Sequence, residues 1–288
     1  MRNEKAPEAR VVRDAVRRQL DEVVGLQDPV RADEPDAVHA TRVALRTMRG
    51  LLTIFAPILE RPRLRRLRRE LRWGGRQLTD ARDLEVLREL FSEELPPEDV
   101  ARPVLDDLDR RYAQAHAHGV AGLNSPRWAA MISSAESVLA DPTSTQRAQA
   151  LHVQTLRDPI DAHVAHRVRP RVAVAEGDPA DLHLWHEVRK AVKSARYAWE
   201  MVAAVPEADD ADRAEAQKWQ AAASAFGALQ DTAVMTDAVV AYLASLPTDS
   251  PTVPVLIDLQ RRLPSRADEQ LATARRLLAE ALSSRPIS

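Results

Sequence analysis

Hydrophobic residues recur every three or four positions along most of the chain, with charged and small residues between them. Val12, Val16, Leu20 and Val23 show this spacing, which is typical of a helix that buries one side. The same pattern covers 8–27, 98–118, 126–140, 146–168, 211–245 and 253–283. The periodicity therefore predicts a chain made of long amphipathic helices.

Proline and aspartate residues mark where three further helices begin and end. One is expected from Asp36 to Pro57, and the next begins at Pro62, because proline is favoured in a first helical turn and disfavoured in a helix interior. In the second half, Asp178 is the expected N-cap, Pro179 the first helical residue, and Pro206 the stop. We predict an all-α fold.

Composition supports this fold and excludes several classes of protein. With 8 Gly and 4% aromatic residues, the chain is rich in helix formers and poor in strand formers. With 0 Cys, disulfides, thiolate catalysis and cysteine-bound metals are excluded. No stretch has the roughly 20 apolar residues of a membrane span, and the charged start has no apolar leader segment. We therefore expect a cytoplasmic protein that is not bound to a membrane.

Two segments of the chain match each other at a constant offset. HATRVALRTMRGLLTIF at 39–55 aligns with HEVRKAVKSARYAWEMV at 186–202, an offset of 147 residues. The alignment pairs His39 with His186, Arg42 with Arg189, Arg46 with Lys193, and Arg49 with Arg196; further on, Asp83 pairs with Asp231 after one extra residue. We expect an internal duplication over 8–285, with repeats at about 8–142 and 146–285. Each repeat would form a bundle of about four long helices, packed side by side.

The paired residues form a basic stripe on each helix. They stand at offsets 0, 3, 7 and 10, which at 100° per residue fall within an arc of about 80° and a length of ~15 Å. Like charges three and four residues apart repel each other in a helix. A polyanion lying along the stripes would remove that repulsion, so each stripe is a candidate anion site.

The average charge hides a strong local excess of cations. The net charge is −2, yet eleven arginines lie between His39 and Arg76 against two acids, Glu60 and Glu70. Segregated charge of this kind indicates a local anion site. After the first stripe, Arg65, Arg68 and Arg72 border the expected apolar face of the next helix, with Arg69 close behind. The other arginines of this segment, Arg61, Arg63, Arg66 and Arg76, are as consistent with a solvated surface.

The second half has fewer cations, mainly Lys190 and Lys218. Asp83 and Asp231 are expected near helix starts, as caps or as salt-bridge partners that orient arginines. Gln230 stands where the first copy has Arg82, which suggests that the second aspartate segment is less tightly ordered.

These segments resemble the CHAD family, whose name stands for conserved-histidine α-helical domain. VHATRVALRTMR, LTDARDLEVL and WHEVRKAVKSARYAWE carry the resemblance, with FGALQD as a weaker match. The resemblance implies two pseudo-symmetric helical bundles around a basic central cavity. It also implies binding of inorganic polyphosphate and an association with polyphosphate granules. The implied ligands are His39, Arg42, Arg46, Arg49, Arg65, Arg68, Arg69, Arg72, His186, Arg189, Lys190, Lys193, Arg196, Tyr197 and Lys218.

Three other functions remain open from the residues alone. A metal-dependent hydrolase of polyphosphate or another phosphoester needs clustered carboxylates or imidazoles, and the sequence shows no such motif. A nucleic-acid-binding module commonly adds aromatic platforms, and only Trp73 and Tyr197 lie near the basic segments. A scaffold would pair its arginines internally with the acidic runs. We expect a binding protein without catalytic residues, metal or cofactor, for which nucleic acid is not the main partner.

Overall fold

Helices account for nearly all of the chain that the computed structural model describes, which is residues 6–59, 64–95, 100, 102–140 and 152–283. No strand occurs in these ranges, so the all-α prediction is confirmed. In chain order the helices are α1 (Ala6–Gly25), α2 (Gln27–Arg31), α3 (Ala37–Ile54), α4 (Ala56–Leu59), α5 (Leu64–Gln77), α6 (Thr79–Glu94), α7 (Arg102–Leu123), α8 (Pro126–Leu139), α9 (Val153–His163), the π-helical turn η1 (Val164–Val168), α10 (Arg169–Gly177), α11 (Leu182–Ala203), α12 (Asp210–Ser245) and α13 (Thr252–Ser283).

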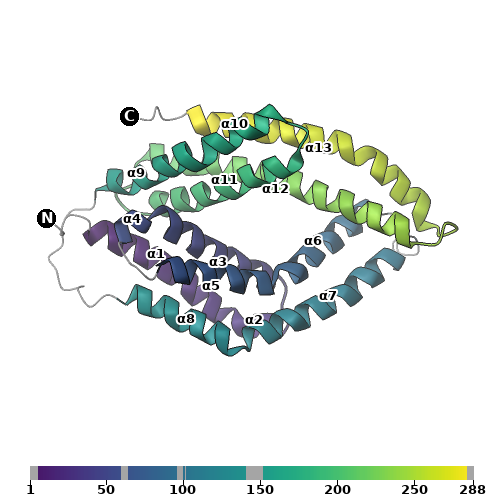
Figure 1. Ribbon diagram of the computed structural model, residues 1–288, viewed down its shortest axis with the longest axis horizontal. Coiled ribbons are helices and arrows are strands. Elements are labelled where there is room, and N and C mark those ends of the chain that lie inside the picture. Colours follow the sequence, from purple (N-terminus) through teal and green to yellow (C-terminus); the bar gives the residue numbers. More distant parts are fainter. Residues whose placement is uncertain (1–5, 60–63, 96–99, 101, 141–151, 284–288) are drawn as a thin grey trace.

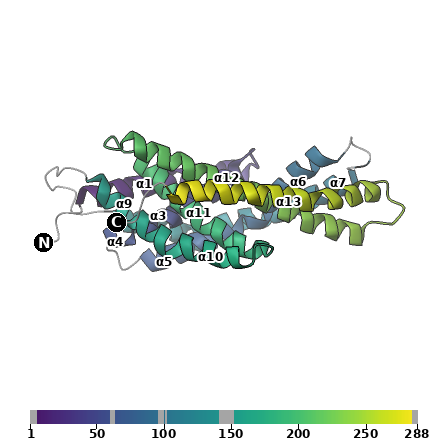
Figure 2. The ribbon, with the colours of Figure 1, turned by 90° about the horizontal axis from the view of Figure 1, so that it is seen from above.

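The two halves of the chain form two layers of helices. In Figure 1, α1 to α8 lie in the lower layer and α9 to α13 in the upper layer. Helices α3 and α11 contact each other where the layers meet, and α6 contacts α12 further along. Seen from above, α5 and α10 lie along one edge, and the first part of α12 lies along the opposite edge (Figure 2). The two expected basic helices are thus neighbours at the centre of the molecule.

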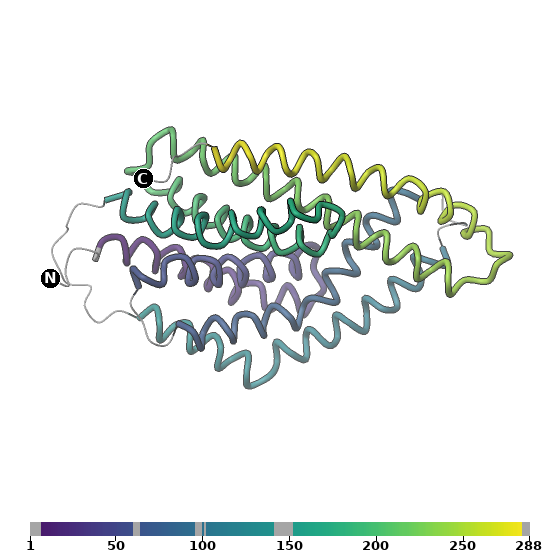
Figure 3. The backbone as a smooth tube through the Cα atoms, turned by 45° about the horizontal axis from the view of Figure 1, so that its top comes forward, coloured from purple at the N-terminus to yellow at the C-terminus, as the bar shows by residue number. Residues whose placement is uncertain are grey.

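Both hydrophobic cores contain residues from both halves. The larger core joins, for example, Leu52 and Phe55 of the first half to Trp185 and Trp199 of the second. The smaller core lies where the α6–α7 and α12–α13 hairpins meet (Figure 3) and includes Phe91 from the first half. The halves are consistent with the expected duplication and with bundles packed side by side, and they also share their cores.

Helix α11 begins three residues later than the sequence pattern indicated. Asp178 follows the end of α10, and Asp181 is the N-cap of α11, with its carboxylate accepting a hydrogen bond from the His183 amide at 2.8 Å. The expectation of an Asp178 cap and a Pro179 start was therefore wrong. Two aspartates three residues apart can each cap a helix, and the sequence could not decide between them. The expected start at Pro62 lies outside the described residues.

The helical path from α9 to α10 runs on to Gly177, nine residues beyond the predicted end at residue 168. Pro170 lies in this stretch, and proline cannot donate the usual backbone hydrogen bond. The π-helical turn η1 precedes this proline, and such turns widen the helix locally. The chain therefore continues through the proline without leaving its helical path.

None of the helices in the described part of the chain combines the length and hydrophobicity that crossing a membrane requires.

Candidate polyanion-binding site

The first stripe lies on α3, which starts after Asp36 and buries Ala44, Leu45, Met48 and Leu52 on its inner side. The second lies on α11, where Val188, Val192 and Trp199 are buried. We call His39, Arg42, Arg46 and Arg49 the α3 stripe. His186, Arg189, Lys193 and Arg196 form the α11 stripe. Burial of the apolar positions fixes the rotation of each helix, so each stripe keeps one direction.

The two helices approach closely at Gly50. A Cβ atom at this glycine would lie 3.6 Å from Tyr197 Cδ2 and 3.8 Å from Ser194 Cα. Gly50 and Tyr197 are separated by the same 147 residues as the paired stripe residues. The small residue allows the α3 and α11 backbones to meet, which brings both stripes into one region.

Arg46 is the residue that connects the two stripes electrostatically. Its charge helps to lower the pKa of His39, Arg42 and Arg49 on α3 and of Arg189 and Lys193 on α11. In each of these five groups the largest cause of the lowered pKa is loss of water on burial. Cations of both halves therefore crowd one partly desolvated region.

Lys193 experiences this crowding most strongly. Burial, followed by the charges of Arg189, Arg46 and Arg196, lowers its pKa from the ordinary value of 10.5 to about 6. Asp231 acts in the opposite direction, but its effect is smaller. The amine is therefore mostly neutral at pH 7, and an anion placed beside it would restore its proton.

Arg42 and Arg189, which are equivalent in the duplication, each hold part of the guanidinium out of water. Arg42 Nη1 donates to Gly75 O at 3.0 Å and to Thr79 Oγ1 at 2.5 Å. The Nε atoms of both arginines are buried and have no hydrogen-bond partner in the described structure. A buried donor without a partner is costly, so an acceptor at these two positions would stabilise the protein.

The two histidines differ in their surroundings. His39 keeps access to solvent, and burial together with Arg82 lowers its pKa. His186 Nδ1 contacts Gln230 Oε1, and burial lowers its pKa too. Gln230 lies within the unbroken helix α12, so the expectation of a less ordered second aspartate segment was wrong.

Two carboxylates lie among the cations, one from each half. Burial raises the pKa of Asp83 and of Asp231, and Arg189 opposes that rise in both. Asp83 is the fifth residue of α6, whose N-cap is Leu78, and Asp231 lies in the interior of α12. The expected helix start at Asp231 was wrong because the break between α5 and α6 at Leu78 has no counterpart in α12.

The remaining residues implied by the resemblance fall into two groups. On α5, Arg72 lies close enough to Arg49 to lower its pKa, and Arg65 does the same to Arg68, whereas Arg69 acts on Glu70. On the second half, Lys190 pairs with Glu187 at 2.5 Å, Arg196 with Glu200 at 2.7 Å and Lys218 with Glu215 at 3.7 Å. Tyr197 is buried, and Arg196 lies over its ring at 5.1 Å.

Two arginines that the sequence analysis did not assign to the site take part in it. Arg82 lowers the pKa of His39 and Arg42, and it pairs with Glu85 at 3.1 Å. Arg76 joins Arg72 in lowering the pKa of Arg49. Arg82 directly precedes Asp83 in the duplicated aspartate segment, so its position in that motif was a signal that could have identified it.

Comparison with known proteins identifies the family of this chain. The family model described as CHAD domain matches residues 14–240. The chain belongs to the CHAD family. The uncharacterized proteins MT2285 and Rv2226 of Mycobacterium tuberculosis strains CDC 1551 and H37Rv are each 29% identical to this CHAD chain over 293 residues. Those alignments cover 96% of this chain and 54% of each relative, so the chain spans about half the length of these curated relatives.

Two solved structures share the fold. The crystal structure of the CHAD domain from the plant Ricinus communis superposes with a TM-score of 0.73 at 20% identity, covering 96% of this chain and 92% of that one. PptA from Streptomyces chartreusis gives a TM-score of 0.66 at 20% identity, with 95% and 98% covered. At this level of identity the similarity concerns the fold alone.

Proposed function

We propose that this CHAD protein binds inorganic polyphosphate between the α3 and α11 stripes and leaves it uncleaved. The observation that carries the proposal is the convergence of cations from both halves around Arg46, which acts on five ionisable groups of the two stripes. Asp83 and Asp231 balance only part of this charge. A linear polymer with one negative charge on each internal phosphate complements two facing rows of cations.

The donors in the site suit phosphate oxygens. Guanidinium groups bind phosphate with two parallel hydrogen bonds, and a lysine adds a compact charge. Polyphosphate beside the stripes would favour the protonated form of Lys193. The CHAD family is associated with polyphosphate binding, which supports the same ligand.

The aromatic side chains near the site do not favour nucleic acid. Single-strand binders stack bases on exposed rings. Trp73 packs edge-on against Trp128 with Arg127 4.4 Å above its ring, and Tyr197 is only 4% exposed. Tyr197 is therefore covered by protein, and Trp73, which is only partly buried, already has Arg127 over its ring.

A hydrolase remains the competing function, because Asp83 and Asp231 have raised pKa values and such carboxyl groups can act as general acids. No group of three or more His, Cys, Asp or Glu side chains in the described ranges could hold a metal ion. We propose instead that both aspartates orient the arginines around them. Association with polyphosphate granules follows from the proposed ligand and is part of the same proposal.

A competition assay tests this function. Labelled long-chain polyphosphate is bound in EDTA and then displaced with unlabelled polyphosphate, orthophosphate, ATP or single-stranded DNA, while orthophosphate release is followed with and without Mg²⁺. We expect unlabelled polyphosphate to compete best, with affinity that falls steeply as salt rises. We expect no release of orthophosphate. Stronger competition by DNA, or metal-dependent release, would contradict the proposal.

A further inference from the structure

A small pocket lies inside the second half of the molecule and is built from residues other than those of the two stripes. Two buried tryptophans, Trp199 and Trp219, form part of its wall together with Asp161, Arg169 and Glu215. The end of α13 completes the wall. The pocket is partly open to solvent and has room for one group about the size of a water molecule. It therefore suits the end of a slender ligand and excludes a large group such as a nucleobase.

The duplication aligns three of these residues with buried leucines of the first half. At the offsets of 147 and 148 that align the stripes and the aspartate segments, the pairs are Trp199 with Leu52, Glu215 with Leu67, and Trp219 with Leu71. The leucines are at most 2% exposed, and Glu215 is 5% exposed. Burying a carboxylate costs stability unless it is paired. The polar pocket is thus a feature of the second half that core packing alone does not explain.

The helix that carries Asp161 contains one extra residue beside the pocket. The buried positions are Val12, Val16, Leu20 and Val23 on α1, and Leu156, Ile160, Val164 and Val168 on α9 and η1. The first three pairs are 144 residues apart and the last pair is 145 apart, so the additional residue falls in η1. Single π-helical turns inside α-helices are frequent at functional sites. Here the turn places Val164 in the wall of the pocket.

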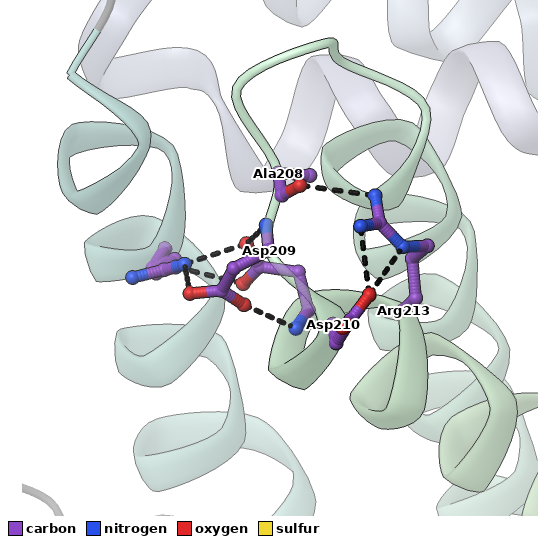
Figure 4. A network of polar contacts seen from close by, with 6 residues as sticks. Ala208, Asp209, Asp210 and Arg213 are labelled. Atoms are coloured by element: carbon purple, nitrogen blue, oxygen red, sulfur yellow. Dashed lines mark hydrogen bonds and ion pairs between the residues drawn. The ribbon is translucent and has the colours of Figure 1, made fainter.

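A network of ion pairs fixes the two helices that bring the carboxylates to the pocket. Arg157 of α9 binds Asp209 at 3.0 Å and Asp212 at 2.5 Å at the start of α12, in the network around Asp209 that Figure 4 shows. Arg157 precedes Asp161 by about one helical turn, and Asp212 precedes Glu215 by about one turn. The network therefore holds Asp161 and Glu215 at a fixed separation.

The charges of the pocket favour a cation. Trp219 Nε1 donates to Glu215 Oε1 at 3.1 Å, and Lys218 Nζ lies 3.7 Å from Glu215 Oε2, which is longer than a hydrogen bond. A carboxylate has about four acceptor positions, so Glu215 has capacity for a further donor. Asp161 and Glu215 also outnumber Arg169, whose guanidinium already donates to a backbone carbonyl of α13 at 2.8 Å. One positive charge in the pocket would balance this excess.

We propose that this pocket binds a primary alkylammonium group, with Glu215 and Asp161 as its acceptors and the two indole rings beside it. Among the aromatic side chains, indole attracts cations most strongly, and the three donors of an ammonium group match carboxylate oxygens. The apolar Val164 suits the methylene groups that follow the ammonium. A free aliphatic amine and a lysine side chain of another protein both present this group. The inference does not depend on the proposed function, because it uses neither stripe.

Titration calorimetry of the full chain at pH 7 tests the pocket with n-butylammonium, with Nα-acetyl-lysine methylamide and with 1-butanol as the neutral analogue. We expect saturable binding of an ammonium probe and no binding of 1-butanol. Glu215→Gln and Asp161→Asn should each weaken the binding about tenfold or more. Glu207→Gln, at an exposed residue outside the pocket, changes the net charge equally and should stay within about twofold of the parent.

Circular dichroism checks that each variant keeps its helicity. If Glu215→Gln does not fold, Asp161→Asn provides the comparison, because its side chain is partly exposed. The proposal is overturned if neither ammonium probe binds saturably, if 1-butanol binds equally well, or if Glu207→Gln loses as much affinity as the pocket variants. Tighter binding of n-butylammonium would support a free amine as the ligand, and tighter binding of the lysine analogue would support the same pocket with a protein as the source of the ammonium group.

Discussion

At the scale of single residues, Lys193 shows why the empty site favours binding of an anion. Its amine is surrounded by Arg46, Arg189 and Arg196, and its pKa falls to about 6. Folding therefore removes a proton that the unfolded chain would keep at neutral pH. A bound polyanion reverses this effect because it favours the charged amine.

Binding of polyphosphate should take up protons at Lys193. The pKa of the empty site is about 6, and a phosphate neighbour raises it, so affinity should increase as the pH falls from 8.5 towards 6.5, by up to about tenfold per unit. His39 and His186, whose pKa values are also lowered, would extend the effect to lower pH. Titration calorimetry in two buffers of different ionisation enthalpy measures the proton uptake directly.

The control for this prediction is Lys193→Arg. A guanidinium stays charged in this environment, so the variant should bind with a weaker dependence on pH. Lys193 would not titrate on binding if the affinity of the parent were the same at pH 6.5 and 8.5. The same conclusion would follow if the affinity of Lys193→Arg depended on pH as strongly as that of the parent.

The same residue predicts how stability depends on pH without ligand. Between its folded pKa of about 6 and its ordinary value of 10.5, the unfolded chain holds one proton more than the folded protein. The free energy of unfolding should therefore rise with pH in this window, by at most about 1.4 kcal/mol per unit. Lys193→Met should reduce the slope and stabilise the protein at pH 7. Urea unfolding of the parent and of Lys193→Met at pH 7 and 9 measures how the free energy of unfolding of each protein changes with pH. An identical change in both proteins would refute the prediction.

Residue-scale reasoning from the sequence found the stripes but not their surroundings. His39, Arg46, Arg189 and Lys193 were identified because their spacing repeats in both halves. Arg82 was not assigned to the site, since its contact with the α3 stripe depends on how α6 packs beside α3. The sequence pattern of one helix contains no information on which neighbour covers it.

At the scale of helices, α3 and α11 approach each other at Gly50 with room for one more methyl group. A Cβ at Gly50 would make ordinary contacts of 3.6 Å or more, whereas a Cβ at Gly119 on α7 would lie 2.8 Å from Leu78 Cδ2 and 3.2 Å from the carbonyl oxygen of Gln77. Both glycines are helical, where alanine is favoured by about 1 kcal/mol. Space around the new methyl group therefore decides the outcome of each substitution.

Gly50→Ala should raise the melting temperature, and Gly119→Ala should lower it. At Gly50 the gain in helix propensity meets no steric penalty, while at Gly119 a backbone carbonyl cannot move aside without shifting α5 or its connection to α6. Thermal unfolding followed by circular dichroism gives both values under identical conditions. The packing described for α3 and α11 would be contradicted if Gly50→Ala destabilised the protein as much as Gly119→Ala.

Helix positions were largely predictable, but their ends were less so. The periodicity located α1, α12 and α13 because each has one buried side over many turns. The periodicity did not show whether Asp178 or Asp181 caps α11. It also ended the predicted helix before Gly177, because the π-helical turn before Pro170 does not appear in the hydrophobic pattern. A matching break was also expected in the second half, and its absence from α12 places Asp231 inside a helix.

At the scale of the whole molecule, the sequence predicted the duplication but not how the halves are joined. Two bundles packed side by side were expected, and in the structure the halves also share both cores, with Phe91 packing edge-on against Tyr242 at a centroid distance of 5.8 Å in the smaller one. Shared burial holds α3 and α11 together although their facing cations repel. Long-range packing of this kind depends on shape complementarity between distant segments, which a one-dimensional pattern does not record.

The central claim is that both stripes bind one polyphosphate chain, and charge reversal in each half tests it most directly. Arg46→Glu and Lys193→Glu place a carboxylate where phosphate must lie, while Arg276→Glu, on an exposed residue of α13 that pairs with Glu280, changes the net charge equally. By titration calorimetry we expect each stripe variant to weaken polyphosphate binding about tenfold or more and the control to stay within about twofold. Equal losses in all three variants, or a loss with Arg46→Glu alone, would contradict a site shared by the two halves.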